Sequence, residues 1–371
     1  MRTGADNPIL ALAEQAKRRD ASPGADGEAP APSPRRPTVA VIIPYYNGSA
    51  WIERAVRSVV AQTVPPDEFI VVNDGSRPEE RQALAGLAEK YGFRVIDQEN
   101  GGQGAARNAG VAACESEFIS FLDQDDFYLP QHIEDLVAAL PANDARLGYV
   151  YADLCGADEN GNVFHSNLLA AQAGAHPKRG HIRDLLRRDM YVLPSASLIA
   201  RPAFEAIGGF DPELTGYEDD DLFVRFFRAG FTNTFLDKPV TVWCKRGGST
   251  SNSVTMARSR FKYFKKLVEA FPDDPVNKVF VFRDCLMRRF GNHFLSDVAK
   301  SGGGDNPHHA ELCNILNEFQ QLVWRRERVP LWRKLRVAAS RFILTRTPAA
   351  MLPAVVRGIR VLLLKRVLLQ A

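Results

Sequence analysis

Apolar and polar positions alternate in two patterns along the first two thirds of the chain. Apolar runs such as residues 38–43 and 118–122 are short and end in turn residues, which is typical of buried strands. Segments such as residues 51–61 instead repeat apolar side chains at helical spacing. The repeated alternation predicts a doubly wound, mostly parallel α/β sheet. The predicted strands span residues 38–43, 69–72, 93–96, 118–122, 149–154, 195–200, 231–237 and 240–244; the predicted helices span residues 51–61, 79–91, 105–113, 180–190 and 218–229.

The pattern divides the chain into three parts. Residues 1–37 are rich in Ala, Pro and Gly, and residues 21–36 lack any large apolar side chain, so this segment is predicted to be disordered. Residues 38–255 hold the α/β alternation. Residues 256–371 change to long helical stretches and carry 22 Lys and Arg against 9 Asp and Glu, a net charge of +13. An acidic part followed by a basic part suggests that the basic part faces an anionic partner.

Composition narrows the class of protein. The chain has 371 residues, of which 45% are hydrophobic and 25% are charged, as in ordinary soluble proteins. Its 5 cysteines are far apart in sequence, which speaks against a zinc site or a disulfide framework and favours a reducing compartment. The N-terminus has no signal-peptide core, and no run of 18 or more residues is apolar throughout. We therefore expect a cytoplasmic protein, at most peripheral at the inner face of the membrane.

Three carboxylates follow the central predicted strand. The sequence FISFLDQDDFYLP puts Asp123, Asp125 and Asp126 just after an apolar run. In an open α/β sheet, ligands bind beyond the carboxyl ends of the strands, and clustered acids there repel one another unless a cation lies between them. Oxygen ligands of this kind suit Mg²⁺ or Mn²⁺ bridging the protein to phosphate. The alternative is a solvated acidic turn before a helix.

Three other strand ends carry candidate binding residues on the same edge. Tyr45 and Tyr46 can each offer a ring to a base, and Asp74 can accept hydrogen bonds from a base or a ribose. Arg107 follows a glycine-rich turn at a helix N-terminus, where phosphates bind. Each alone has an ordinary structural explanation, but their convergence on one edge favours a nucleotide site. The glycine turn is not a dinucleotide fingerprint, because the third glycine position holds Arg107.

Five motifs together resemble the family 2 inverting glycosyltransferases of the GT-A fold. They are VIIPYYNGSAWIERAVRSVVAQT, FIVVNDGS, NGGQGAARNAGV, SEFISFLDQDDFYLP and GYEDDDLFVRF. The resemblance implies a nucleotide-sugar donor bound by strand-end residues, with Asp125 as the main metal ligand, Asp123 near the ribose and the metal, and Mn²⁺ or Mg²⁺ as cofactor. The residues implied to bind the donor are Pro44, Tyr46, Asn47, Asp74, Arg107 and Asp123.

Glu218 and Asp219 resemble the acceptor-side acid pair of that family. An acceptor hydroxyl must lose a proton as it attacks the anomeric carbon, and a carboxylate within hydrogen-bond reach can take it. The resemblance implies that Asp219 is the base and Glu218 its neighbour. The alternative is that these acids only cap a helix N-terminus. The chain also departs from the family pattern, because Arg246 stands where a His is common; we expect Lys245 or Arg246 to reach the diphosphate, unless this loop is simply a basic surface.

The basic C-terminal part has two interpretations. In residues 331–344, Leu331, Leu335, Ala338 and Phe342 share one helical face, and residues 325–366 contain 12 Lys and Arg with one acid. Such helices can lie on an anionic membrane surface. They can equally pack on the catalytic domain or on a partner. Nucleic acid is not expected, because no recognition motif accompanies the charge.

The sequence thus predicts a metal-assisted inverting glycosyltransferase. It would move a sugar, expected from a UDP-sugar, to a hydroxyl of a glycan or lipid-linked acceptor. A non-catalytic nucleotide-sugar-binding or scaffolding module at the membrane is the alternative, and the presence of Asp125 and Asp219 argues against it. A nucleotidyltransferase would need a Lys or Arg in the first strand-end loop, and residues 44–48 have none.

Overall fold

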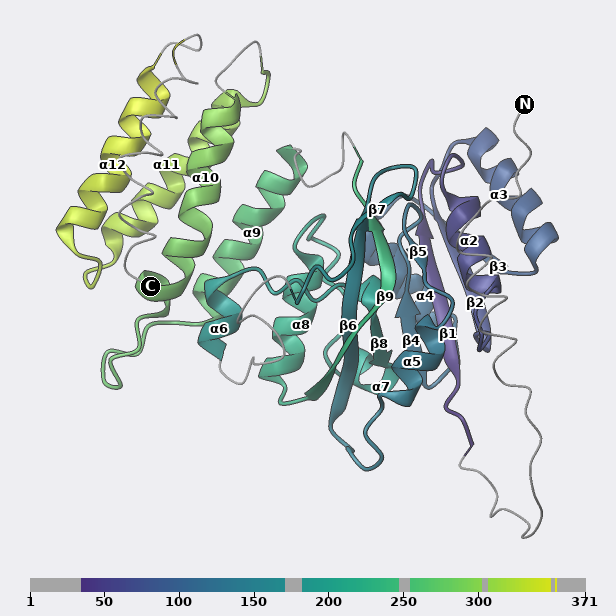
Figure 1. Cartoon of the computed structure of the whole chain (residues 1–371). Helices are drawn as coiled ribbons and strands as arrows, with labels where there is room; N and C mark the ends of the chain where they lie inside the picture. The colour runs from purple at the N-terminus through teal and green to yellow at the C-terminus, as the bar shows by residue number, and fades with distance from the viewer. Residues whose placement is uncertain (1–34, 171–181, 247–253, 302–305, 348–350, 352–371) are drawn as a thin grey trace.

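The structure is a computed structural model, and it describes residues 35–170, 182–246, 254–301, 306–347 and 351. The disorder predicted for residues 1–37 lies almost wholly outside the described residues, and so do residues 352–366 of the basic C-terminal segment. Figure 1 shows a twisted sheet flanked by helices, followed by a group of C-terminal helices.

The first four strands and their connecting helices match the predicted alternation to within a few residues. The strands are β1 (Val39–Tyr45), β2 (Glu68–Asp74), β3 (Arg94–Gln98), β4 (Phe118–Phe121), β5 (Phe127–Tyr128), β6 (Leu147–Ala157), β7 (Val163–His165), β8 (Ser197–Ala200) and β9 (Thr232–Cys244). The helices of this part are α2 (Ile52–Val60), α3 (Pro78–Tyr91), α4 (Gln103–Ala112), α5 (His132–Ala138), α6 (Ile182–Arg187), η1 (Pro194–Ala196), α7 (Arg201–Ala206) and α8 (Glu218–Arg228).

One sheet holds these strands in the order β3-β2-β1-β4-β8-β6-β9-β5, with β7 beside β6. β3, β2, β1 and β4 are parallel neighbours. β8 then runs antiparallel to both β4 and β6, while β6 and β9 are parallel. The sheet is therefore a mixed α/β sheet whose parallel half contains the predicted strand ends, and the predicted fold class is confirmed.

The last core strand differs from the prediction. Residues 231–237 and 240–244 were expected to form two strands separated at Lys238-Pro239, but β9 is continuous. Pairing with β6 runs along its whole length and absorbs the interruption as register shifts on either side of Asp153. Pairing with β6 has thus kept the strand continuous through Lys238 and Pro239, where the local sequence predicted a break. Proline lacks the backbone N–H that a regular ladder needs, so it is tolerated where the pairing is irregular. The short strand β5, which pairs with β9, was not predicted.

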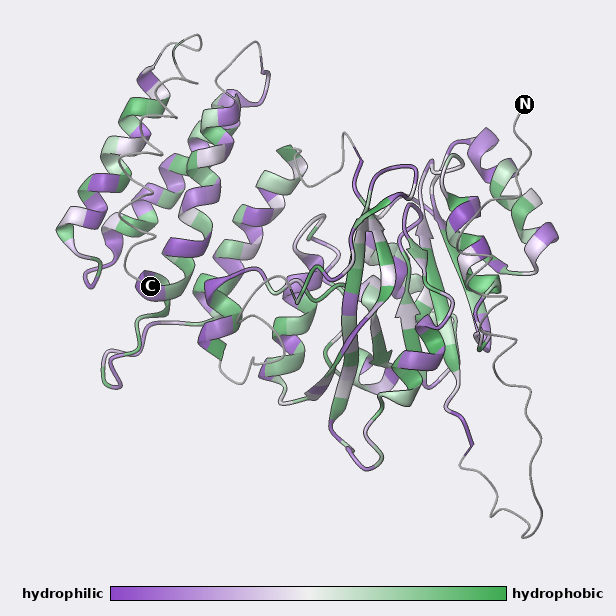
Figure 2. Ribbon diagram, in the orientation of Figure 1, coloured by the Kyte–Doolittle hydropathy of each residue, from purple (hydrophilic) through white to green (hydrophobic). Residues whose placement is uncertain are grey.

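The two faces of the sheet are covered by different helices. Alternate residues of β1 point to opposite faces, as a strand requires: Ala40 and Ile42 join one hydrophobic cluster, and Val41 and Ile43 join the other. α2, α3 and α5 contribute to the second cluster, while α4, α7 and α8 contribute to the first. In Figure 2 the strands are largely hydrophobic and the covering helices carry both hydrophobic and hydrophilic residues.

The C-terminal helices extend the first cluster. They are α9 (Val254–Ala270), η3 (Phe282–Leu286), α10 (Met287–Ser301), α11 (His309–Arg325) and α12 (Leu331–Arg346). Phe264, Phe290 and Phe319 are fully buried and belong to the same hydrophobic cluster as β4 and α8. The helices from residue 254 to residue 346 therefore share a continuous core with the sheet. Among the described helices, none is long and apolar enough to cross a membrane.

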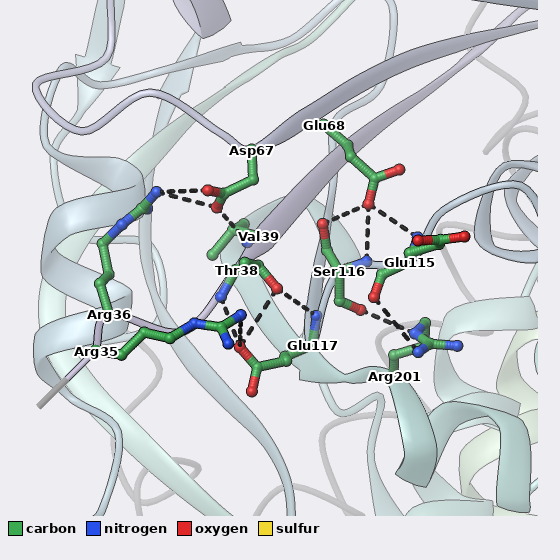
Figure 3. Close-up of polar contacts among 10 residues, drawn as sticks. All are labelled: Arg35, Arg36, Thr38, Val39, Asp67, Glu68, Glu115, Ser116, Glu117 and Arg201. Carbon is green, nitrogen blue, oxygen red and sulfur yellow. Dashed lines mark hydrogen bonds and ion pairs between the residues drawn. The ribbon is translucent and has the colours of Figure 1, made fainter.

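Acidic side chains fasten the N-terminal ends of the parallel strands (Figure 3). Asp67 accepts from the Val39 amide at 2.8 Å and pairs with Arg36 at 3.0 Å. Glu68 accepts from the Ser116 hydroxyl at 2.6 Å and from two backbone amides, which ties β2 to the segment before β4. These acids lie at the strand starts, opposite the predicted site, and they connect neighbouring strands.

Candidate active site

The strand ends bring most of the predicted site residues to one edge of the sheet. β1, β2 and β4 are parallel neighbours, so the segments that follow them leave the sheet on the same side. Direct hydrogen bonds link these segments. The Tyr46 amide donates to Gln124 Oε1 at 2.9 Å, and Gln124 Nε2 donates to the Tyr46 carbonyl at 3.2 Å. Gln124 lies between the predicted acids, and sequence reasoning gave it no role.

The loop after β1 is held in an unusual backbone conformation. Pro44 is buried within β1, and Asn47 adopts a left-handed φ of 46°. The Asn47 side chain accepts from the Arg77 amide at 3.0 Å, while the Asn47 amide donates to Ser76 Oγ at 3.0 Å. These bonds fix the loop against the end of β2. Tyr45, also expected to offer a ring, is fully buried and donates its hydroxyl to Glu80 Oε2 at 2.7 Å, so that expectation is wrong. Tyr46 is 49% exposed, so its ring can meet a planar ligand.

Asp74 supports the glycine loop in this structure. Its carboxylate accepts from the Gly101 and Gly102 amides, each at 2.8 Å, and from Gln98 Nε2 at 2.7 Å. Gly102 has a φ of 86°, a conformation that favours glycine. Asp74 thus shapes the turn before α4, and its predicted contact with a base or a ribose stays a prediction.

Arg107 joins the two acid clusters. It lies in α4 with a side chain that is 3% exposed, and its Nη2 contacts Asp123 Oδ1 at 2.6 Å while its Nη1 contacts Glu218 Oε1 at 3.3 Å. Gln103 Nε2 also donates to Asp123 at 2.6 Å. A buried cation between two acids keeps them close without mutual repulsion. Arg107 was predicted to lie near the base or the diphosphate; the structure gives it this bridging position.

Asp125 and Asp126 differ in their partners. Asp125 pairs with Arg246, whose guanidinium lies 4.0 Å from the centroid of the Trp51 ring. Asp126 is buried and accepts from the Cys244 amide at 2.8 Å. Burial and the nearby charge of Asp123 raise the pKa of Asp125, and the same two causes raise that of Asp126 further. Arg246 therefore lies beside the predicted metal ligand.

The acids after β4 fit a divalent metal of the Mg²⁺ or Mn²⁺ type. Asp123 and Asp125 supply hard oxygen ligands, and the repulsion that raises the pKa of Asp125 is what a cation would relieve. Within the described part of the chain, no three metal-ligating side chains converge on one point. Magnesium commonly uses only one or two carboxylates together with substrate phosphates and water, so two acids are a sufficient protein contribution.

The acidic start of α8 contains one carboxylate unlike its neighbours. Three of the four acids form ion pairs: Glu218 with Arg107, Asp220 with Arg289, and Asp221 with Arg225 and Lys266. Asp219 forms none with any described residue, and its carboxylate accepts only the Asp220 amide at 2.8 Å. Burial, together with the charges of Glu218 and Asp220, raises the pKa of Asp219 well above its usual value.

A raised pKa suits a general base, because proton transfer is most effective when the pKa of the base approaches the working pH. Glu218 lies on Arg107, which also contacts Asp123, so the start of α8 and the end of β4 meet around one guanidinium. The arrangement therefore has two ion-paired acids after β4, Asp123 and Asp125, and on α8 one carboxylate, that of Asp219, which forms no ion pair with a described residue. Such a pair of environments can bind a phosphorylated group and accept a proton from a hydroxyl nearby.

Known proteins share this sequence pattern and this fold. A family profile described as "Glycosyl transferase family 2" matches residues 40–208. The uncharacterized glycosyltransferase RP339 of Rickettsia prowazekii (strain Madrid E) is 30% identical over 273 residues, which cover 71% of this chain and 79% of the relative. These matches span the strand-end loops and reach well beyond a single motif.

Solved structures agree with the fold. S. aureus TarS 1–349 in complex with UDP has a TM-score of 0.55 at 17% identity, covering 86% of this chain and 91% of that one; against the longer TarS structure the chain covers 55% of its length. The mannosyltransferase PcManGT of Pyrobaculum calidifontis, in complex with GDP-Man and Mn²⁺, has a TM-score of 0.50 at 18% identity and covers 91% and 94%. The sheet, the acid-bearing strand ends and the sequence matches lead to one conclusion: this chain belongs to glycosyl transferase family 2.

Proposed function

We propose that the protein transfers a sugar from a nucleotide-sugar, expected to be a UDP-sugar, to a hydroxyl of a glycan or lipid-linked acceptor with inversion at the anomeric carbon. The observation that carries the proposal is Asp219. It lies among four acids of which the other three are neutralised by ion pairs, and its pKa is raised. Keeping one carboxylate unpaired costs stability, which is expected where the group has a chemical task.

The proposed step is a single displacement. Asp219 accepts the proton of the acceptor hydroxyl, the acceptor oxygen forms a bond to the anomeric carbon, and the bond from that carbon to the diphosphate oxygen breaks. Because attack and departure occur on opposite faces, the configuration inverts. Glu218 holds Arg107, which fixes Asp123 relative to α8. This bridge would keep the distance between base and donor constant.

The donor would bind along the strand-end loops. Tyr46 offers an exposed ring for the base, and Asp74 holds the glycine loop that borders the diphosphate. Asp125 and Asp123 would hold the divalent metal, which supplies positive charge to the leaving diphosphate. Arg246, which lies beside Asp125 and the Trp51 ring, would supply positive charge to the diphosphate. TarS and PcManGT, which share the fold, were solved with UDP and with GDP-Man and Mn²⁺, which supports this class of donor.

A thermal-shift screen of UDP-, GDP- and CMP-sugars, with and without Mn²⁺, tests the donor site. A ligand that binds only the folded state stabilises it by about 2.7 kcal/mol at about 100 times its Kd. We expect a Mn²⁺-dependent rise in Tm with one nucleotide class and its loss in Asp125→Ala. Asp135→Ala is the matched control, since Asp135 pairs with Lys238 away from this edge. A Mn²⁺-dependent rise that survives in Asp125→Ala would refute the metal assignment.

We also propose that α12 binds an anionic membrane surface. Leu331, Leu335 and Phe342 are 62%, 53% and 60% exposed, so the predicted apolar face points outward from the helical region. α12 carries five Lys and Arg and no acid, which complements anionic lipid. The other face of α12 packs inward through Val337. Figure 2 shows both hydrophobic and hydrophilic residues along this helix.

Co-sedimentation with phosphatidylglycerol–phosphatidylcholine vesicles tests this surface. Leu335→Glu with Phe342→Glu should lower binding about tenfold, because both substitutions place acids against an anionic surface. Val276→Glu, at an apolar side chain that is 89% exposed in another loop, is the control and should bind normally. Unchanged binding by the double variant would refute the membrane proposal. A change in oligomeric state instead would assign the face to a second copy of the chain.

A further inference from the structure

The acidic start of α8 depends on residues of the C-terminal helices. Asp220 Oδ2 pairs with Arg289 of α10, and the other oxygen of Asp220 accepts from the Met190 amide at 3.0 Å. Arg289 also contacts Asp189 at 2.9 Å, and its side chain is only 2% exposed. Arg289 therefore joins the residue beside Asp219 to the segment after α6.

The turn before α8 is held by α9. Tyr217 precedes Glu218 and adopts a left-handed φ of 63°, which is strained for a side chain of this size. Arg260 Nε donates to Tyr217 Oη at 3.1 Å, and the Tyr263 ring stacks on the Tyr217 ring at 5.5 Å. Ser259 Oγ donates to the Gly216 carbonyl at 2.5 Å. Such strain persists only where surrounding contacts hold it.

A third link fixes the next acid. Lys266 of α9 contacts Asp221 at 2.8 Å and Asp211 at 2.6 Å. Tyr217 before Asp219, and Asp220 and Asp221 after it, are thus tied to α9 or α10, whereas Glu218 is tied to Arg107 of α4. Asp219 itself takes no part in these ties with any residue the structure describes. Its position is set by its neighbours.

We propose that Arg289 is a positioning residue which, together with α9, holds the start of α8 so that Asp219 faces the donor. This inference rests on the proposed function. It makes the helices from residue 254 onward part of the catalytic site, in addition to any role at a membrane. A buried Arg bridging two acids is costly to assemble, so its retention points to a geometric task.

Arg289→Met tests the proposal in the full-length protein. We expect the kcat for nucleotide-sugar hydrolysis, with water as the acceptor, to fall 10- to 100-fold while the donor KM changes less than twofold. Misplacing a reacting group by about 1 Å costs roughly 100-fold. Arg289→Lys, which keeps the charge, should recover part of kcat. Amide hydrogen exchange of residues 214–221 should become at least tenfold faster in Arg289→Met, a readout that needs no turnover.

Arg258→Met is the matched control. Arg258 of α9 pairs with Glu311 of α11, away from α8. The kcat of Arg258→Met and its amide hydrogen exchange should therefore match those of the unchanged protein. Normal kcat and normal exchange in folded Arg289→Met would overturn the proposal. If that variant does not fold, Ser259→Ala and Arg289→Gln decide, because Arg289→Gln also removes the charge that pairs with Asp220. Normal exchange of residues 214–221 in both variants would refute the proposal. If Asp219→Asn loses turnover while Arg289→Met keeps normal kcat and normal amide exchange, the proposed function stands and only this inference is refuted.

Discussion

Acids lie at both ends of the parallel strands, but their surroundings differ. At the strand starts, burial alone would raise the pKa of Glu68, yet the Ser116 hydroxyl and the Glu115 and Ser116 amides hold it below its usual value. At the opposite edge, burial and neighbouring charges raise the pKa values of Asp125, which follows β4, and of Asp219, at the start of α8. The first set of acids is matched with donors, and the second set is crowded with other acids.

The comparison separates acids whose surroundings favour the charged carboxylate from acids whose surroundings disfavour it. A carboxylate that accepts several hydrogen bonds favours folding, because its charged form is better solvated in the native state. A buried carboxylate next to like charges disfavours folding in its charged form. Residues of the second kind persist where they serve a ligand or a reaction. The structure places this kind of acid at the edge where the family motifs converge.

The largest effect expected from this difference is on turnover. Asp219→Asn should lower kcat by roughly 10² to 10⁴, the usual contribution of a general base, while the donor-induced rise in Tm is kept. The asparagine can still accept the Asp220 amide, so the start of α8 keeps its shape. The measurement is nucleoside diphosphate release at saturating donor, alongside the thermal shift.

Glu68→Gln provides the contrast for that experiment. The substitution removes a charge from the opposite edge of the sheet, where Glu68 accepts hydrogen bonds from Glu115 and Ser116 in the segment before β4. Its kcat should stay within twofold of the unchanged protein. Near-normal turnover in Asp219→Asn would remove Asp219 as the base and reopen the scaffolding alternative.

Local pattern was enough to predict the strand-end loops. β1, β2 and β4 were each indicated by a short apolar run, and their polar ends could be assigned to one edge because parallel neighbours share direction. The acids among residues 123–126 were found in the same way, whereas Glu218 and Asp219 were assigned from their resemblance to the acceptor-side acid pair of the family. The sequence therefore indicated which polar and charged residues each strand-end loop brings to this edge of the sheet.

The partners of those acids could not be predicted. Arg107 was expected near the base or the diphosphate, which stays a prediction, and its contacts with Asp123 and Glu218 come from residues 16 and 111 positions away in the sequence. Arg289 lies 69 residues beyond Asp220, among several basic residues with nothing local to distinguish it. Ion pairs between distant elements depend on tertiary geometry, which residue spacing alone does not encode.

The second expected effect is on stability at the opposite edge. Glu68→Ala removes the acceptor of the Ser116 hydroxyl and of two backbone amides. Hydrogen bonds to charged groups contribute about 1.5–3 kcal/mol, so we expect the free energy of unfolding to fall by about 2 kcal/mol at pH 7. Urea denaturation measures this change. A loss of kcat in the folded variant, with stability unchanged, would invert the assignment of the two edges.

The smallest effect expected concerns pH. The pKa of Asp219 is higher in the folded protein than in the unfolded chain, so the folded state binds its proton more tightly, and stability from this group falls as pH rises from about 4 through the raised value. Asp219→Asn removes that loss. The variant should therefore be more stable than the unchanged protein at pH 8, by about 1.4 kcal/mol for each unit of the shift, and the difference should vanish below pH of about 4.

Glu68 has a lowered pKa, so Glu68→Gln should show the opposite trend. Its free energy of unfolding should be lower than that of the unchanged protein above pH of about 4.5, and this difference should disappear on acidification. Urea titrations of both variants across this range measure the two trends together, and parallel curves would mean that the two edges do not differ electrostatically.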